Sequence, residues 1–241
     1  MENRITEFSQ RKAAIVAGIG YLIIFVLAIF SNFFVLSNLI ISDDPAATVN
    51  NILASVGIFR IGIISFVIVA ILDVVVAMAL YILFKPIYKS LSLLAAWFRL
   101  MHAILFGVAI VNLILVANIL NGDHNLTTSV TNEVQILVMI LLDWFNIGWL
   151  IGLVFFGIHL YILGYLIIKS DYIPKILGYL LILAALGYLI DSFAHFLLAD
   201  YNNYKAIFLI IVAVPGIVGE MSFCLWLLFK GTKISEIKLE N

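Results

Sequence analysis

Nine ionisable residues interrupt the long apolar segments of this chain, and their chemistry is the most informative feature of the sequence. On insertion scales, an arginine or aspartate at the centre of a membrane helix costs about 2.5–3.5 kcal/mol. Such residues are therefore expected to face the interior of a helix bundle, to pair with one another and to form a buried polar core. The nine residues are Arg60, Asp73, Arg99, His102, Asp143, His159, Asp191, His195 and Glu220.

Distances from the ends of the apolar segments place most of these residues in two layers, one in each half of a membrane. The outer layer, about nine residues from one end of the segments at a rise of 1.5 Å per residue, contains Arg60, Asp143 and Asp191. The inner layer, about ten to thirteen residues from the other end, contains Asp73, Arg99, His102, His159 and Glu220. Each layer therefore holds one arginine and two carboxylates.

The single arginine of each layer can neutralise one carboxylate and leaves the other without a cation. The expected pairs are Arg60 with Asp143 or Asp191, and Arg99 with Asp73 or Glu220. The surplus acid must be protonated, paired with a histidine or bound to a cation, since an unpaired buried charge is strongly unfavourable. The arrangement is compatible both with ion pairs that fix helix register and with a pathway for a solute or a proton.

The histidines allow metal or haem chemistry as an alternative. His102 and His159 lie at similar depth on different segments, as bis-histidine haem ligation requires. Asp191 and His195, four residues apart, share one helix face and could bind a metal together with Asp143. The sequence has neither a CxxCH nor an HExxH motif. We therefore predict no cofactor and no resident metal, and retain an intramembrane metal- or haem-dependent enzyme as an alternative.

Glu220 lies beside a predicted break in its helix. Pro215 removes one helical hydrogen bond and frees a backbone carbonyl, while Gly216 and Gly219 leave space next to the carboxylate. Broken helices beside an acid are typical of transporter sites. We expect Glu220 to be the surplus acid, able to take up and release a proton near neutral pH. In the alternative, Glu220 pairs with Arg99 and Asp73 is the surplus acid.

The composition defines the class of protein that must position these residues. The chain has 241 residues, of which 65% are hydrophobic and 11% charged, and its mean hydropathy is +1.20. A soluble domain is typically about 45–50% apolar and about 25% charged, so a water-soluble enzyme and a disordered chain are excluded. A net charge of −1 excludes the basic surface of a nucleic-acid-binding protein, and the single Cys224 excludes an internal disulfide.

Six apolar segments are long enough to cross a membrane, which takes about 20 residues. They predict an all-α polytopic integral membrane protein with six transmembrane helices in one bundle, forming a single domain over residues 1–241. The apolar run after Lys12 is too long for a signal peptide and is expected to be an anchor. Gly148 and Gly152 predict a face where two helices pack closely. The predicted spans are, to within a few residues, 13–41, 53–84, 91–120, 134–168, 176–199 and 206–229.

Basic residues outside the spans lie almost entirely on one side, which predicts the orientation of the chain. Only Lys205 falls on the opposite side. By the positive-inside rule both termini are cytoplasmic, in a multi-pass protein of the cell (inner, cytoplasmic) membrane. The residues on the basic side are Arg4, Arg11, Lys12, Lys85, Lys89, Lys169, Lys175, Lys230, Lys233 and Lys238.

Short motifs spread from residue 51 to residue 228 together resemble a known family. They include Phe59-Arg60-Ile-Gly62, Gly152-Leu-Val-Phe-Phe-Gly-Ile-His159, Gly187-Tyr-Leu-Ile-Asp191 and Gly219-Glu220. On these motifs the chain resembles, nearly end to end, the prokaryotic multi-pass membrane family named domain of unknown function 4386. The resemblance implies a single helical membrane domain. It includes several of the buried charges but implies no catalytic residue, substrate or cofactor.

These observations favour an integral membrane protein whose buried ionisable core binds or translocates a small solute or a proton. Its partners would be the lipid bilayer and that solute, and no nucleic acid. The metal- or haem-dependent enzyme is one alternative. The other is a structural or regulatory membrane component whose charges serve only to pair helices. The sequence leans away from an enzyme, assigns no catalytic residue and sets no oligomeric state.

Single cysteines test the predicted orientation. Cysteines at Asp44 and Asn202 should react with a membrane-impermeant thiol reagent added outside intact cells, whereas cysteines at Lys89 and Tyr172 should react only after the cells are opened. The reason is that the basic loops remain on the cytoplasmic side. Reaction from outside at Tyr172 would contradict the six-span arrangement.

Overall fold

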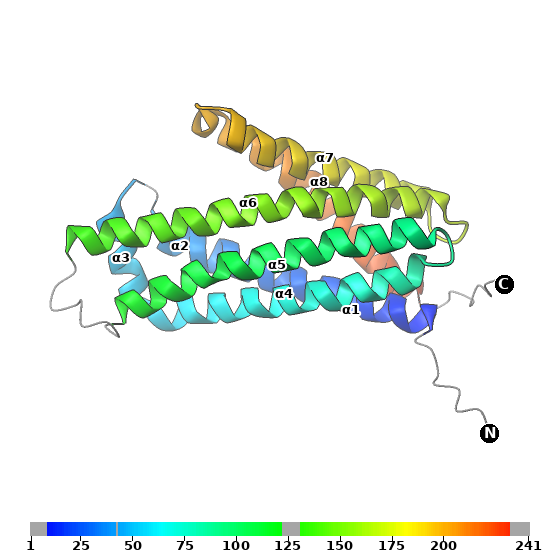
Figure 1. Cartoon of the computed structure of the whole chain (residues 1–241), viewed down its shortest axis with the longest axis horizontal. Coiled ribbons are helices and arrows are strands. Elements are labelled where there is room, and N and C mark those ends of the chain that lie inside the picture. Colours follow the sequence, from blue (N-terminus) through cyan, green and yellow to red (C-terminus); the bar gives the residue numbers. More distant parts are fainter. Residues whose placement is uncertain (1–8, 42, 122–130, 232–241) are drawn as a thin grey trace, which may run out of the picture. The chain divides into compact units, whose positions relative to one another are not determined.

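A computed structural model describes residues 9–41, 43–121 and 131–231 of the chain. Within these residues every regular element is a helix, and there is no strand. A helix satisfies the backbone hydrogen bonds of its central turns within one segment, as an apolar membrane interior requires. The elements are α1 (Gln10–Ile29), the π-helix η1 (Phe30–Leu36), α2 (Ser37–Leu39), α3 (Pro45–Ala54), α4 (Val56–Phe84), α5 (Lys89–Leu120), α6 (Asn132–Lys169), α7 (Lys175–Leu197) and α8 (Tyr201–Phe229) (Figure 1).

Six stretches of helix in the described residues are long and apolar enough to span a membrane, which confirms the predicted number of spans. They are Gln10–Leu39, Val56–Phe84, Lys89–Leu120, Asn132–Lys169, Lys175–Leu197 and Asn203–Phe229. The 38 residues of α6 exceed the roughly 20 that cross the hydrocarbon core. We therefore expect α6 to extend beyond the hydrocarbon or to tilt.

The second predicted span begins too early, because a short helix precedes it. Asp44 caps α3 by accepting a hydrogen bond from the Ala47 backbone N–H at 2.9 Å, and Pro45 occupies the first helical position. Ser55 then leaves the helical region, with φ −133° and ψ 34°, so α4 starts at Val56. The apolar composition of residues 52–54 hid this break from the sequence pattern.

Contacts divide the chain into two compact units. Unit 1 comprises Met1–Leu22, Leu72–His102 and Gly152–Asn241, and unit 2 comprises Ile23–Ile71 and Ala103–Ile151. Helices α4, α5 and α6 each contribute one stretch to each unit. The single domain over residues 1–241 stays a prediction.

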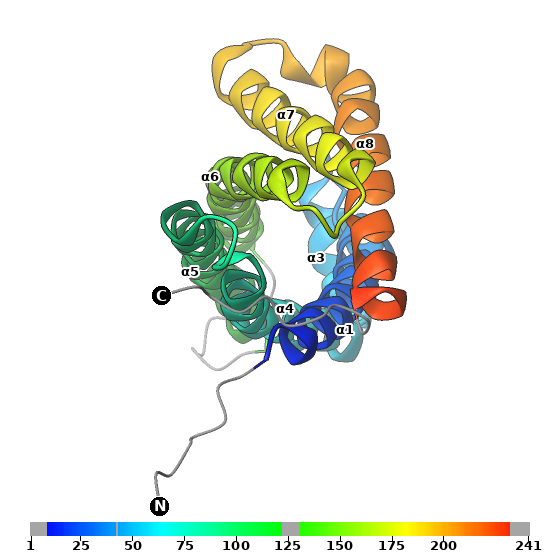
Figure 2. The same cartoon turned by 90° about the vertical axis from the view of Figure 1, so that its right-hand side faces the viewer.

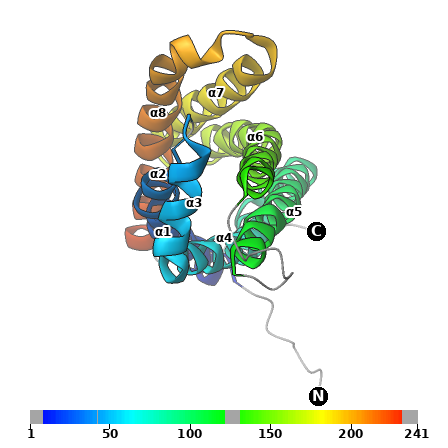
Figure 3. The ribbon, with the colours of Figure 1, turned by 90° about the vertical axis from the view of Figure 1, so that its left-hand side faces the viewer.

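Unit 2 has an aromatic core. Phe66 packs edge-on against Phe106, with the ring centroids 5.3 Å apart, and Trp149 packs edge-on against Phe106 at 4.6 Å. Figure 3 shows α5 beside α6, and in unit 2 a Cβ added at Gly148 would lie 2.8 Å from the Cβ of Ala109. Gly148 therefore allows close packing of α5 against α6 within one chain, as the glycine pair predicted.

In unit 1, glycines bring α7 close to its neighbours (Figure 2). A Cβ added at Gly164 of α6 would lie 2.6 Å from the carbonyl oxygen of Gly178 in α7, and the reverse contact is equally short. A Cβ at Gly187 of α7 would lie 2.6 Å from the carbonyl oxygen of Ile211 in α8. Pro215 frees this same carbonyl, because it has no N–H to donate to the residue four positions earlier. Pro215 and Gly187 thus act together at the α7–α8 contact.

Candidate functional site

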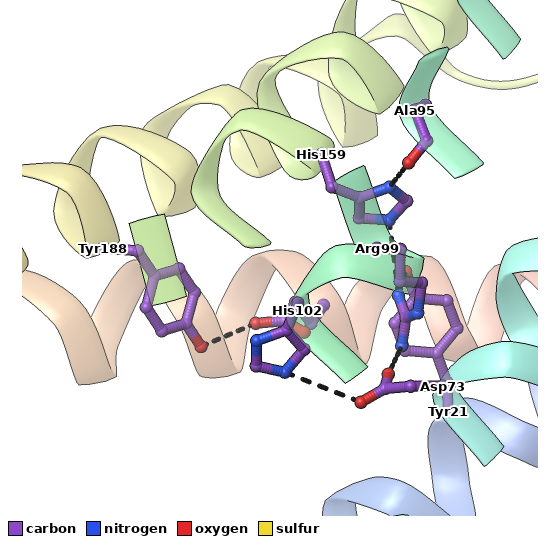
Figure 4. A network of polar contacts seen from close by, with 8 residues as sticks. Tyr21, Asp73, Ala95, Arg99, His102, His159 and Tyr188 are labelled. Carbon is purple, nitrogen blue, oxygen red and sulfur yellow. Dashed lines mark hydrogen bonds and ion pairs between the residues drawn. The ribbon is translucent and has the colours of Figure 1, made fainter. Parts of the chain in front are cut away.

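The centre of the polar network in unit 1 is Arg99 of α5, whose side chain is fully buried. Its Nη2 donates a hydrogen bond to Asp73 Oδ1 of α4 at 2.6 Å, and its Nη1 donates to the hydroxyl of Tyr21 in α1 at 2.7 Å (Figure 4). The guanidinium also lies over the Tyr21 ring, with Cζ 4.6 Å from the centroid. The structure thus selects Asp73 as the acid that Arg99 neutralises, one of the two pairings that the sequence left open.

His159 of α6 is a third partner of Arg99 and is neutral. Its Nδ1 lies 2.8 Å from the carbonyl oxygen of Ala95, and its Nε2 lies 3.3 Å from Arg99 Nη1. A carbonyl can only accept and a guanidinium can only donate. The proton therefore sits on Nδ1, and Nε2 accepts from Arg99. Both ring nitrogens of His159 are used, so ligation of haem iron by this residue would first have to break one of these bonds.

The other oxygen of Asp73 faces a second histidine. Nε2 of His102, one turn along α5 from Arg99, lies 3.6 Å from Asp73 Oδ2. A Cβ at Gly152 would lie 3.1 Å from His102 Nδ1, so this glycine of α6 leaves room for the imidazole. Asp73 is only 2% exposed and lies between Arg99 and His102, which both belong to α5.

Glu220 of α8 belongs to a separate polar pair. The hydroxyl of Tyr188 in α7 donates a hydrogen bond to Glu220 Oε1 at 2.8 Å. Gly216, one turn earlier on α8, makes room for this hydroxyl, because a Cβ there would lie 3.1 Å from it. Glu220 takes part in neither of the two ion pairs within 4.0 Å that the described residues form, and unlike Asp73 it is partly exposed.

Phe156 of α6 packs between the two polar pairs. Its ring centroid lies 5.4 Å from the guanidinium Cζ of Arg99, 5.0 Å from the ring of His102 and 5.4 Å from the ring of Tyr188. An aromatic face can hold a cation but cannot carry a proton between acids. Phe156 therefore packs against members of both pairs.

Each of the six spanning helices supplies at least one side chain either to the contacts around Arg99 or to the Tyr188–Glu220 pair. The contributions are Tyr21 from α1, Asp73 from α4, Arg99 and His102 from α5, His159 from α6, Tyr188 from α7 and Glu220 from α8. All of these residues belong to unit 1. The residues of the predicted inner layer thus lie in two groups of contacts in unit 1, one around Arg99 and the other the Tyr188–Glu220 pair.

The outer layer does not form the expected buried core. Arg60 and Asp143 are exposed, and Arg60 makes no ion pair within 4.0 Å to any residue that the structure describes. The predicted pair of Arg60 with Asp143 is therefore wrong. Depth along a helix fixes a residue's height but not the direction in which its side chain points, and here these side chains point away from the packed faces.

Asp191 is partly exposed and has a partner that the sequence analysis did not consider. The hydroxyl of Tyr201, at the start of α8, donates a hydrogen bond to Asp191 Oδ1 at 2.6 Å. Burial, together with the bond to Asp191, raises the pKa of the Tyr201 hydroxyl, so it stays protonated and remains a donor. The ring of His195 packs against Tyr201 with the centroids 4.1 Å apart.

Tyrosines are the part of the site that sequence reasoning missed. Tyr21, Tyr188 and Tyr201 each donate to, or accept from, a charged group of unit 1. The available signal was the position of Tyr21 and Tyr188 deep within their spans, away from the interfacial zone where tyrosine is most common. Among the described residues, no group of three or more His, Cys, Asp or Glu side chains is arranged to hold a metal ion.

Six apolar helices that share a buried, charged network define a multi-pass integral membrane protein. The chain belongs to the family described as Domain of unknown function (DUF4386), which matches residues 16–231. A protein of Archaeoglobus fulgidus described as "Uncharacterized protein" is 34% identical over 175 residues, which cover 73% of this chain and 86% of the relative. No solved structure matches the chain. The family resemblance predicted from the motifs is confirmed.

The two arginines within the spans should differ sharply in their effect on stability. Arg99→Ala should lower the free energy of unfolding in detergent by about 3–5 kcal/mol, because it leaves Asp73 buried without its cation. Arg60→Ala, the matched control at an exposed position, should change it by less than about 1 kcal/mol. In an Asp73→Asn background the cost of Arg99→Ala should shrink. Equal losses for the two arginine variants would contradict this account of the network.

Proposed function

We propose that unit 1 contains a proton-binding site, that Glu220 is the group that exchanges the proton, and that the protein uses this exchange to bind or translocate a proton or a small solute. The observation that carries the proposal is the division of the two inner acids. Asp73 receives the Nη2 hydrogen bond of Arg99, whereas Glu220 receives the hydroxyl of Tyr188.

The Tyr188 hydroxyl suits an acid that changes its protonation state. Toward an ionised Glu220 the hydroxyl donates, as in the structure. Toward a protonated Glu220 it can rotate and accept from the carboxyl O–H, because a phenol is both donor and acceptor. The same two oxygens can therefore stay in contact through a full cycle of proton uptake and release. A guanidinium, which only donates, would favour the ionised acid alone.

The Arg99–Asp73 pair supports a structural role for the other half of the network. Arg99 is fully buried and Asp73 nearly so, and together with Tyr21 and His159 they connect α1, α4, α5 and α6. Glu220 lies within electrostatic range of the Arg99 and Asp73 charges. In this proposal the pair holds the helices in register and supplies a fixed, nearly cancelling charge background for Glu220.

The geometry supports the metal- or haem-dependent alternative less well. His159 already uses both ring nitrogens, and His102 lies beside Asp73. Bis-histidine ligation would have to dismantle the contacts that hold Arg99 and Asp73. For the location of the protein we propose the cell (inner, cytoplasmic) membrane with both termini in the cytoplasm, on the strength of the basic tails and loops.

Infrared difference titration of the carboxyl stretch tests the assignment of Glu220. The protein in lipid should show a protonated-carboxyl band that titrates near neutral pH, and Glu220→Gln should abolish it, because the variant amide cannot bind a proton. Asp73→Asn is the matched control and should leave the band in place. A band that survives Glu220→Gln and disappears in Asp73→Asn would move the role to Asp73. The absence of any titrating carboxyl band would contradict the proposal.

A further inference from the structure

A second cluster of titratable side chains lies in unit 1 at the end of the α7–α8 hairpin, where residues 198–200 join the two helices. It consists of Asp191 and His195 of α7 and Tyr201 of α8. The Tyr201 hydroxyl donates to Asp191 Oδ1 at 2.6 Å, and the His195 ring packs on Tyr201. Neither of these two contacts belongs to the network around Arg99, so their role needs a separate explanation.

The spacing of polar residues on α7 connects this cluster to the Glu220 site. Asp191, Ser192 and His195 follow Tyr188 by three, four and seven residues. Residues three, four and seven positions apart lie on one face of a helix, one or two turns from each other. This polar stripe of α7 therefore runs from Tyr188, which contacts Glu220, to the end of the hairpin.

Ser192 in the middle of the stripe lacks a hydrogen-bond partner. Its side chain is fully buried, and its Oγ makes no hydrogen bond to any protein atom that the structure describes. Buried hydroxyls nearly always have a partner, because an unsatisfied one costs about 1–3 kcal/mol. A water molecule bound at Ser192 would satisfy this hydroxyl and would lie one turn from Tyr188.

Along the stripe, exposure is highest at the hairpin end and lowest at Ser192, while Tyr188 and Glu220 beyond it are partly exposed. His195 is exposed, Asp191 and Tyr201 are partly exposed, and Ser192 is buried. An exposed imidazole can take up a proton from the surrounding water, and His195 shares its helix face with Asp191.

We infer that the polar stripe of α7 is the route by which protons reach Glu220, with uptake at the Asp191–His195–Tyr201 cluster and transfer through water at Ser192. In the last step, Tyr188 gives its hydroxyl proton to Glu220 Oε1 and takes one from the water at Ser192. That water is reprotonated by the proton taken up at the Asp191–His195–Tyr201 cluster, so both the phenol and the water are regenerated. The inference rests on the proposed proton exchange at Glu220. It adds the point of proton entry, which is the end of the α7–α8 hairpin.

The charged and titratable groups near Glu220 come from four helices. Glu220 accepts a hydrogen bond from Tyr188 of α7 and interacts electrostatically with Tyr21 of α1, Asp73 of α4 and Arg99 of α5. Arg99 and Asp73 are buried, so these two groups do not take protons directly from water. At the hairpin end, Asp191 and His195 both face Tyr201.

The rate of hydrogen–deuterium exchange at the Glu220 carboxyl tests the route. After rapid mixing of the protein in lipid nanodiscs with heavy water, the isotope shift of the carboxyl band reports proton exchange directly. Asp191→Asn and Ser192→Val should slow this exchange by about tenfold, equivalent to a barrier higher by about 1.4 kcal/mol, while the pH midpoint of the band stays unchanged. The matched controls are Asp143→Asn, an exposed acid in unit 2, and Ser170→Ala, a buried serine that bonds the Ile167 carbonyl.

The outcomes separate this inference from the proposed function. Exchange at the wild-type rate in both Asp191→Asn and Ser192→Val overturns the route and leaves the role of Glu220 intact. Equal slowing by Asp143→Asn also overturns it, because a general effect of removing a carboxylate would then explain the result. A carboxyl band that does not depend on Glu220 overturns the proposed function, and the route with it.

A labelling experiment tests water access to the stripe even if the Asp191→Asn or Ser192→Val variant fails to fold. Ser192→Cys, which keeps the size of the side chain, should react with a small charged methanethiosulfonate reagent in a Cys224→Ala background, because such reagents need water to reach the thiol. Ser65→Cys, a buried position in unit 2, is the control and should stay unreactive. A folded Ser192→Cys protein that does not react would overturn water access to the stripe.

Discussion

A buried arginine that neutralises only one of two inner carboxylates is the constraint on which the site in unit 1 depends. Arg99 carries one positive charge, and its Nη groups are taken by Asp73, Tyr21 and His159. A buried ion pair is tolerated when both charges are matched and hydrogen-bonded, but a further charge in the same low-dielectric region is not. Glu220 is left with a neutral tyrosine, and its charge has to be managed by a proton or a cation.

The backbone of unit 1 is adapted to bring these side chains together. Gly152 leaves room for His102, Gly216 leaves room for the Tyr188 hydroxyl, and Gly187 lets α7 approach the carbonyl that Pro215 frees in α8. Phe156 fills the space between the two acid pairs. The same small residues that permit close helix packing in an apolar solvent therefore also position the polar groups, so packing and chemistry are constrained together in this unit.

Much of the fold is predictable because a membrane restricts the possible structures to long apolar helices. The hydropathy pattern shows how many such helices there are and where each one lies along the chain. Depth along the chain also offered Asp73 as one of two possible partners of Arg99, and the structure pairs Arg99 with Asp73. Depth along a helix does not determine the direction in which a side chain points around the helix axis. Depth alone therefore predicts a buried core for Arg60 and Asp143, although both are exposed. The roles of Tyr188 and Tyr201 were missed because a neutral hydroxyl becomes informative only when its acidic partner is known, and both partners lie on other helices.

The most direct measurement is solid-state nuclear magnetic resonance of the protein in lipid, with the carboxyl carbons of aspartate and glutamate labelled in separate samples. The chemical shift of a carboxyl carbon reports whether the group is ionised, and the Glu220→Gln and Asp73→Asn variants assign the two signals. The division of the two acids predicts that Asp73 stays ionised across neutral pH while Glu220 changes its protonation state. An ionised Glu220 throughout, or an Asp73 signal that titrates in its place, would contradict the account.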